Sequence, residues 1–119
     1  PFHIMNKSIH QACKQARKDH HLLLNDLAYI LNIDQGNLSS FEAGRSPHSK
    51  ALAGYQILFN LSIQSTIGQV FQSGHKPWID RCFQLVEKID EYAPNTPKNR
   101  KRIEGLDTVI TNLMALQNG

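Results

Sequence analysis

The chain has 119 residues, of which 40% are hydrophobic, and a formal net charge of +3 with neutral histidines. This length suits one hydrophobic core with an extension rather than two cores. No run of about 18 apolar residues occurs, and residues 1–4 lack the hydrophobic run of a signal peptide, so we expect neither a membrane partner nor export.

The two cysteines, Cys13 and Cys82, stand alone in the sequence, each on an apolar helical stripe. A free cysteine in such a place behaves as a small hydrophobic side chain. We therefore expect reduced thiols and a cytoplasmic setting.

The first predicted element is a helix over about residues 8–18, with Ser8 or Asn6 as its cap. Small and apolar side chains recur along it at helical spacing and are expected to face inward: Ile9, Ala12, Cys13 and Ala16.

Residues 25–47 carry the clearest pattern in the chain, two short helices joined by a tight turn. Apolar residues at helical spacing indicate the first helix: Leu27, Ala28 and Leu31. Asn32 tolerates the left-handed conformation that ends a helix, and Asp34 is a favourable cap for a second helix over residues 35–42. That helix has two inward residues, Leu38 and Phe41. Its opposite face carries uncharged groups suited to base edges: Gln35, Asn37, Ser39 and Ser40.

Ser46 and Pro47 are expected to open the next helix, because proline fits the first turn of a helix. Its inward residues follow helical spacing, and two further residues close the core: Leu52, Tyr55, Leu58 and Phe59, then Leu61 and Ile63. A fifth short helix is predicted near residues 66–71, and residues 73–75 break it. Residues 6–73 would form one domain.

The sequence pattern of residues 74–119 predicts an extension of two helices. The compact N-terminal domain does not need this extension. Residues 76–78 have the pattern of a helix start, and Thr96 and Pro97 are expected to cap and open the last helix. Both helices carry a broad apolar face. The pair either covers the N-terminal core or forms a homodimer. Its dimer interface would contain Trp78, Phe83, Ile103, Leu106, Ile110 and Leu113.

Residues 9–61 resemble the lambda-repressor-like, or XRE-family, helix-turn-helix domain of bacterial and phage regulators. The resemblance is carried by fifteen ordered positions: Arg17, Leu22, Leu27, Ala28, Leu31, Ile33, Leu38, Phe41, Glu42, Gly44, Pro47, Leu52, Tyr55, Leu58 and Leu61. It implies an all-α protein, with a five-helix DNA-binding domain preceding the extension. It also implies a sequence-specific transcriptional regulator, most often a repressor, that binds a palindrome in double-stranded DNA as a dimer, without a cofactor.

The resemblance also implies a role for individual residues. Three side chains would contact bases: Gln35, Asn37 and Ser40. Five positions would contact the DNA backbone: Arg45, Lys50, Asn25, Gly36 and Ser39. Arg17 and Glu42 occupy the positions of an internal ion pair in the family, which joins the first helix to the recognition helix.

Two departures from the family pattern bear on function. Leu23 and Leu24 stand where many relatives have a Ser or Thr cap followed by a Gln that meets a DNA phosphate. Either they pack on the C-terminal helices while Asn25 or Asp26 caps the helix, or they belong to a protein-binding surface. Gly36 stands where a side chain often touches a base. Since glycine costs about 1 kcal/mol of helix stability relative to alanine, close approach to DNA explains it better.

Basic residues gather in the helix-turn-helix region and again in a basic strip, which we define as Lys98, Arg100, Lys101 and Arg102. Cations that flank a recognition helix are expected of a DNA-binding protein, because phosphate neutralisation supplies much of its affinity. The basic strip stands at a helix start, where positive charge opposes the helix dipole. Three uses of the strip stay open: a DNA contact, solvated charge, or an acidic protein partner.

Other chemistries have little support in the sequence. The histidines and cysteines lack metal-binding spacing, and the phosphate-binding and nucleophile motifs GxxxxGK[ST], GxGxxG and GxSxG do not occur, so we expect neither a metal site nor an enzyme. The competing function is a protein-interaction module, antitoxin-like or anti-repressor, whose extension binds a protein partner while DNA binding is weak or lost. Leu23, Leu24 and Gly36 favour that alternative.

Overall fold

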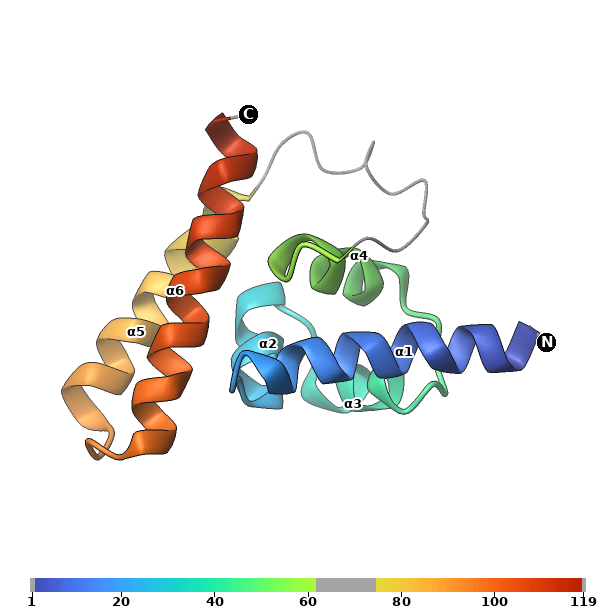
Figure 1. Cartoon of the computed structure of the whole chain (residues 1–119), viewed down its shortest axis with the longest axis horizontal. Coiled ribbons are helices and arrows are strands. Elements are labelled where there is room, and N and C mark those ends of the chain that lie inside the picture. The colour runs from blue at the N-terminus through green and yellow to red at the C-terminus, as the bar shows by residue number, and fades with distance from the viewer. Residues whose placement is uncertain (1, 62–74, 119) are drawn as a thin grey trace.

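The structure is a computed structural model that describes residues 2–61 and 75–118 of the chain. These residues form six helices and no strand: α1 (Phe2–Asp19), α2 (Leu24–Leu31), α3 (Gln35–Glu42), α4 (Ser49–Leu58), α5 (Lys76–Tyr92) and α6 (Pro97–Asn118). The prediction of an all-α protein is confirmed for this part of the chain. Helices α1 to α4 form one group, and the antiparallel helices α5 and α6 pack against α2 and α4 at one end of it (Figure 1).

Local capping residues end and begin the helices as expected. Asn32 ends α2 in the left-handed conformation, with φ 55° and ψ 49°. The carboxylate of Asp34 accepts the backbone N–H of Asn37 at 3.2 Å and so caps α3. In the same way Thr96 accepts the backbone N–H of Asn99 at 3.2 Å, which caps α6. Each cap of this kind stabilises a helix by about 1 kcal/mol.

Two helix starts differ from the prediction. Helix α1 begins at Phe2 rather than near Ser8, and no proline or glycine in residues 2–7 interrupts it. Helix α4 begins at Ser49 rather than at Pro47, because the ring Nδ1 of His48 accepts the backbone N–H of Ala51 at 3.2 Å and serves as the cap.

Some expectations on the N-terminal helices are corrected or stay untested. Ala12 of α1 is exposed rather than buried, whereas Cys13 and Ala16 lie in the core. The predicted fifth helix near residues 66–71, Ile63 and the domain boundary at residues 73 and 74 lie outside the described residues.

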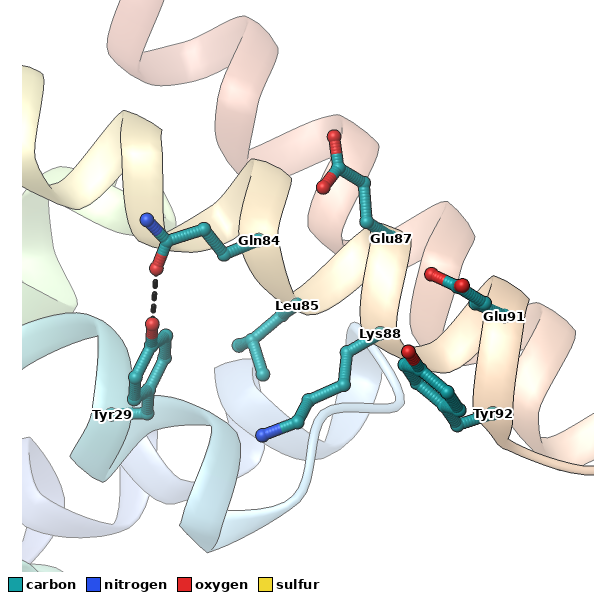
Figure 2. A pocket seen from close by; sticks show the side chains of 7 residues that line it. All are labelled: Tyr29, Gln84, Leu85, Glu87, Lys88, Glu91 and Tyr92. Carbon is teal, nitrogen blue, oxygen red and sulfur yellow. Dashed lines mark hydrogen bonds between the residues drawn. The ribbon is translucent and has the colours of Figure 1, made fainter.

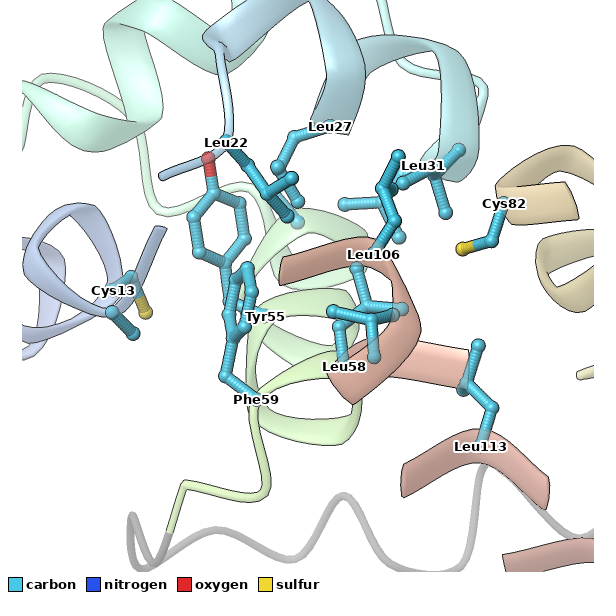
Figure 3. Packing of buried hydrophobic residues seen from close by; sticks show 14 of the residues in the cluster. Cys13, Leu22, Leu27, Leu31, Tyr55, Leu58, Phe59, Cys82, Leu106 and Leu113 are labelled. Atoms are coloured by element: carbon cyan, nitrogen blue, oxygen red, sulfur yellow. The ribbon is translucent and has the colours of Figure 1, made fainter. Parts of the chain in front are cut away.

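One hydrophobic cluster runs through both parts of the chain (Figure 3). Tyr55 of α4 is fully buried on the side of α1 and α2, where Cys13 and Leu27 also lie. Leu106 of α6 projects toward Leu31 of α2, between the N-terminal helices and Cys82 of α5. The extension and the N-terminal helices therefore share a core.

This shared core corrects the predicted dimer interface at three positions. Leu106 and Leu113 have no exposed surface and Ile110 keeps 6%, so in this structure they cannot contact a second copy. The apolar stripe of α6 is covered by the chain's own helices, which is the alternative use that the sequence left open. The other three expected interface residues keep more surface: Trp78 and Ile103 are partly buried, and Phe83 is 47% exposed.

A buried ion pair fixes α6 on the first turn of α2. The guanidinium of Arg102 binds the carboxylate of Asp26 through two contacts, of 2.7 Å and 3.2 Å. Their side chains are only 14% and 3% exposed. A two-contact pair of this geometry fixes orientation as well as distance.

Side chains of α5 and α6 also bind the free carbonyls at the ends of two N-terminal helices. Arg81 of α5 donates to the carbonyl of Ile30 at 3.1 Å, at the end of α2. Asn112 of α6 donates to the carbonyl of Leu58 at 3.0 Å, at the end of α4. The last carbonyls of a helix have no partner within it, so these contacts satisfy groups that would otherwise need water.

Gly105 allows α6 to approach the turn that follows α1. A Cβ atom at this position would lie 1.9 Å from the carbonyl oxygen of His20. Because that oxygen belongs to the backbone, it cannot rotate away. Helix α6 therefore needs glycine at this crossing.

Candidate nucleic-acid interface

Helix α3 is anchored on one side and open on the other. Its inner residues Leu38 and Phe41 have no exposed surface. Its other side is exposed. We call this side the α3 outer face and define it as Gln35, Gly36, Asn37 and Ser39. Helix α3 lies away from α5 and α6, whose main packing is against α2 and α4 (Figure 1). The C-terminal helices therefore leave the α3 outer face uncovered.

An ion pair joins α3 to α1. Arg17 contacts the carboxylate of Glu42 through Nε at 2.8 Å and Nη2 at 2.9 Å, and its Nη1 donates to the carbonyl of Leu22 at 2.9 Å. The hydroxyl of Tyr55 also donates to Glu42. The hydrogen bond to Glu42 raises the pKa of Arg17 above its usual value. Burial raises the pKa of Tyr55, and its bond to Glu42 raises it further. The end of α3 is thus held to both α1 and α4.

Two exposed cations stand at the two ends of α3. Arg45 follows α3, just beyond Gly44, whose φ of 79° turns the chain away from the helix. Lys50 donates from Nζ to the carbonyl of Asn32 at 3.3 Å, in the turn before α3. The helix is about 12 Å long, so the pair spans the whole of its outer face.

The remaining residues expected to contact DNA are placed less uniformly. Ser40, predicted to touch a base, is partly buried. Asn25 is exposed in the first turn of α2, directly before the Asp26 that binds Arg102. The structure therefore leaves Gln35, Asn37 and Ser39 exposed on α3 and sets Asn25 apart on α2.

Gly36 has a reason within the chain itself. A Cβ atom there would lie 3.0 Å from Oδ2 of Asp34, the oxygen that accepts the backbone N–H of Asn37. A side chain would therefore crowd the cap of α3. The neighbour is the end of a side chain that can move, and the approach to DNA expected for Gly36 stays a prediction.

Leu23 and Leu24 are packed rather than fully exposed. Both are partly buried, and Leu24 lies against the hydrophobic core. Leu23 precedes α2 and has no side-chain acceptor, but Asp26 accepts its backbone N–H at 2.9 Å. Packing and partial capping by Asp26 thus follow one of the two alternatives for this segment. Neither leucine side chain carries a group that could donate a hydrogen bond to a phosphate.

A hollow of about 270 Å³ lies between α2 and α5 (Figure 2). The hydroxyl of Tyr29 donates to Gln84 across it. Tyr29 is 44% exposed, and Tyr92 at the far end is 76% exposed. The hollow is also lined by Leu85, Glu87, Lys88 and Glu91. Exposed tyrosines are frequent in protein–protein interfaces, so this surface suits a protein partner better than a nucleic acid.

Both cysteines are buried free thiols, and burial raises the pKa of Cys13 and of Cys82 to about 12. Residues 2–61 and 75–118 contain no group of three or more His, Cys, Asp or Glu arranged to hold a metal ion. Among the described helices, none combines the length and the apolar composition needed to cross a membrane.

No protein-family model matches the chain, and neither curated proteins nor solved structures give a significant match. Its function is therefore inferred from its own residues.

Proposed function

We propose that the chain is a sequence-specific DNA-binding transcriptional regulator with a lambda-repressor-like, XRE-type helix-turn-helix domain, in which α3 is the recognition helix. The α3 outer face carries the proposal. It presents the uncharged groups of Gln35 and Asn37 on a firmly anchored helix, with Arg45 and Lys50 at its ends. Amide groups hydrogen-bond to base edges and cations neutralise phosphates, so this combination supports binding in the major groove.

Gln35 is the main base-reading residue in this proposal. Its amide donates to N7 and accepts from the N6 amino group of one adenine, a pairing that discriminates against other bases. Asn37 and Ser40 add weaker contacts, and Arg45 binds a phosphate. The bond between Lys50 and Asn32 leaves the remaining ammonium protons of Lys50 for a second phosphate. In this proposal the chain acts in the cytoplasm as a repressor that excludes RNA polymerase by occupying an operator, and it needs neither a cofactor nor enzymatic activity.

A homodimer completes this mechanism. One short helix contacts only a few base pairs, whereas two copies related by a two-fold axis bind a palindrome with half-sites about one helical turn apart. Leu106, Ile110 and Leu113 are excluded from that contact by their burial, and Phe83 is the most exposed of the six residues first assigned to it. Sedimentation equilibrium of the intact chain on a palindromic duplex should give two copies per duplex, and one copy would contradict the dimer.

Selection from a random duplex library tests the proposal. The intact chain should enrich a palindromic motif, and Gln35→Ala should relax the preference at one position in each half-site by about 1–3 kcal/mol. Gln11→Ala, at an exposed glutamine of α1, is the matched control and should leave the motif unchanged. If the intact chain enriches no motif, the proposal fails.

A protein-interaction module is the second candidate, and the hollow beside Tyr29 and Tyr92 favours it. In that case the α2–α5 surface binds a protein partner and DNA binding is weak or lost. Two results together would support this candidate over the regulator. The intact chain would enrich no motif from the duplex library, and it would bind a protein partner whose binding Tyr92→Ala abolishes.

A further inference from the structure

Three cations at the start of α6 have no evident role in the fold. Lys98, Arg100 and Lys101 are exposed, and none of them forms an ion pair with a described residue. Only the fourth member of the basic strip, Arg102, is neutralised, by Asp26. The first turn of α6 has no acidic residue, so these charges face the positive end of the helix dipole. They weaken the helix start rather than support it, which points to a partner outside the chain.

The turn of the helix places these cations at different angles around its axis. Successive residues of a helix are rotated by about 100°, so Lys98 lies about 40° from Arg102, one turn nearer the helix start. Lys101 lies about 60° from Lys98 around the axis, whereas Arg100 is about 160° from Arg102. Consistent with this, Arg100 lines a hollow with Asp90 at the end of α5. Lys98 is thus on the α2 side of the helix and Arg100 is on the other side, while Lys101 lies about 100° from both Arg102 and Arg100.

The ion pair between Arg102 and Asp26 brings Lys98 to the first turn of α2, with Lys101 next to Lys98 around the helix. Asn25, the residue before Asp26, is exposed there. The segment beside it is also where packed Leu23 and Leu24 offer no side chain to a phosphate. In Figure 1 the start of α6, the start of α2 and helix α3 all lie toward the lower edge of the molecule.

We propose that Lys98 and Lys101 form a second contact with the DNA backbone, on phosphates that flank the base pairs bound by α3. This inference rests on the proposed function. The ligand is the phosphodiester backbone of duplex DNA, and the contact carries no sequence information. It replaces, from the extension, the phosphate contact that the leucines at the start of α2 do not provide. The ion pair of Arg102 with Asp26 positions Lys98 for it, and Lys101 extends the contact from about 60° farther around the helix.

The salt dependence of DNA binding tests this contact. Each phosphate neutralised by a cation contributes about 0.9 to the slope of log K against log salt concentration. The Lys98→Gln/Lys101→Gln variant of the full chain should therefore show a slope lower by about 1.8 on the selected duplex, while its preferred sequence stays the same. Arg100→Gln is the matched control, since it removes a cation from the same helix turn on the side opposite Lys98, and its slope should stay near that of the unmodified chain.

The outcomes separate this inference from the proposed function. If the unmodified chain binds no duplex, both fail. If it selects a motif but the double variant keeps the full slope, only the contact through α6 is overturned. An equal loss in Arg100→Gln also overturns it, because the effect would then be one of general charge. If the slope is unchanged and the unmodified chain, but not the double variant, binds a polyglutamate peptide, the lysines serve an acidic protein partner instead.

Discussion

Helices α2 and α3 are both eight residues long, but the C-terminal helices cover only one of them. Helix α2 is packed by α5 along its side and bound by Arg102 at its start and by Arg81 at its end. Helix α3 is packed on its inner side alone, and its outer face is exposed. The extension therefore completes the core around α2 and leaves α3 as the open surface.

This difference matters because neither helix is long enough to be stable alone in water. Helix α2 gains its stability from packing on two sides. Helix α3 depends on Leu38, Phe41 and the ion pair of Glu42 with Arg17. A helix that is firmly held yet polar on its free side is suited to bind a ligand, whereas α2 is suited to connect the two parts of the chain.

The largest effect is expected when the connection between α6 and α2 is broken. Arg102→Met leaves the carboxylate of Asp26, which is 3% exposed, without its cation. Removing one partner of a buried ion pair is strongly destabilising, so we expect a loss of about 3 kcal/mol in the free energy of unfolding, measured by urea denaturation. Since α3 does not take part in this contact, the DNA motif selected under folding conditions should not change.

An exposed pair on α5 provides the control for this prediction. Lys76 and Asp80 are 3.2 Å apart, with side chains 76% and 51% exposed. Lys76→Met should lower stability by less than about 0.5 kcal/mol, as for other exposed pairs one turn apart. The double variant Asp26→Asn/Arg102→Met should lose less than the sum of its single variants, because the two side chains act as a unit. Additive losses would show that the ion pair does not join the helices.

The next effect concerns the crossing at Gly105. Gly105→Ala places a methyl group against the carbonyl of His20, which forces α6 away from the turn after α1. We expect a loss of about 2 kcal/mol, the difference between overpacking and the gain in helix propensity from alanine. Gly36→Ala on α3 is the matched control. There the methyl group meets only the movable carboxylate of Asp34, so the loss should stay below about 1 kcal/mol. Equal losses at both glycines would remove the distinction between the two helices.

The sequence predicted local features well because their signals lie within a few residues. Asn32, Asp34 and Thr96 end or cap helices through contacts with their near neighbours. The apolar stripe of α6 likewise showed that one side of the helix must be covered. It did not show what covers it, because a stripe that packs on α4 and one that packs on a second copy have the same spacing.

Features that depend on distant residues were out of reach of the sequence pattern. Arg102 and Asp26 are separated by 76 positions, and neither residue type marks a pair at that separation. Gly105 is an ordinary glycine until the path of α6 past His20 is known. The exposure of Gln35 and Asn37 was easier to predict, since Leu38 and Phe41 mark the inner side of this short helix. For Gly36 the sequence suggested an approach to DNA, which stays a prediction, and it did not show that a Cβ atom there would lie 3.0 Å from the carboxylate of Asp34.

The smallest effect uses the two thiols, one in each part of the molecule. Burial raises the pKa of Cys13 and of Cys82 to about 12, above the value of about 8.5 for an exposed thiol. The folded state therefore holds these protons where the unfolded state loses them, so stability is fully present below pH 8 and declines as pH rises toward 12. Between pH 7.5 and 9 the two thiols together should reduce the free energy of unfolding by on the order of 1 kcal/mol.

Urea denaturation across this pH range measures the decline in the free energy of unfolding. Labelling of the thiols at pH 8 then reports how readily each of the two regions opens. In the unmodified chain both thiols should react slowly. In Arg102→Met, Cys82 of α5 should react faster while Cys13 of α1 stays protected, because the C-terminal helices then separate from α2 before the N-terminal core opens. The Cys13→Ala/Cys82→Ala variant should show no such pH dependence. If both thiols react at the same increased rate, the extension and the N-terminal helices open as one unit, and α2 has no separate role as their connection.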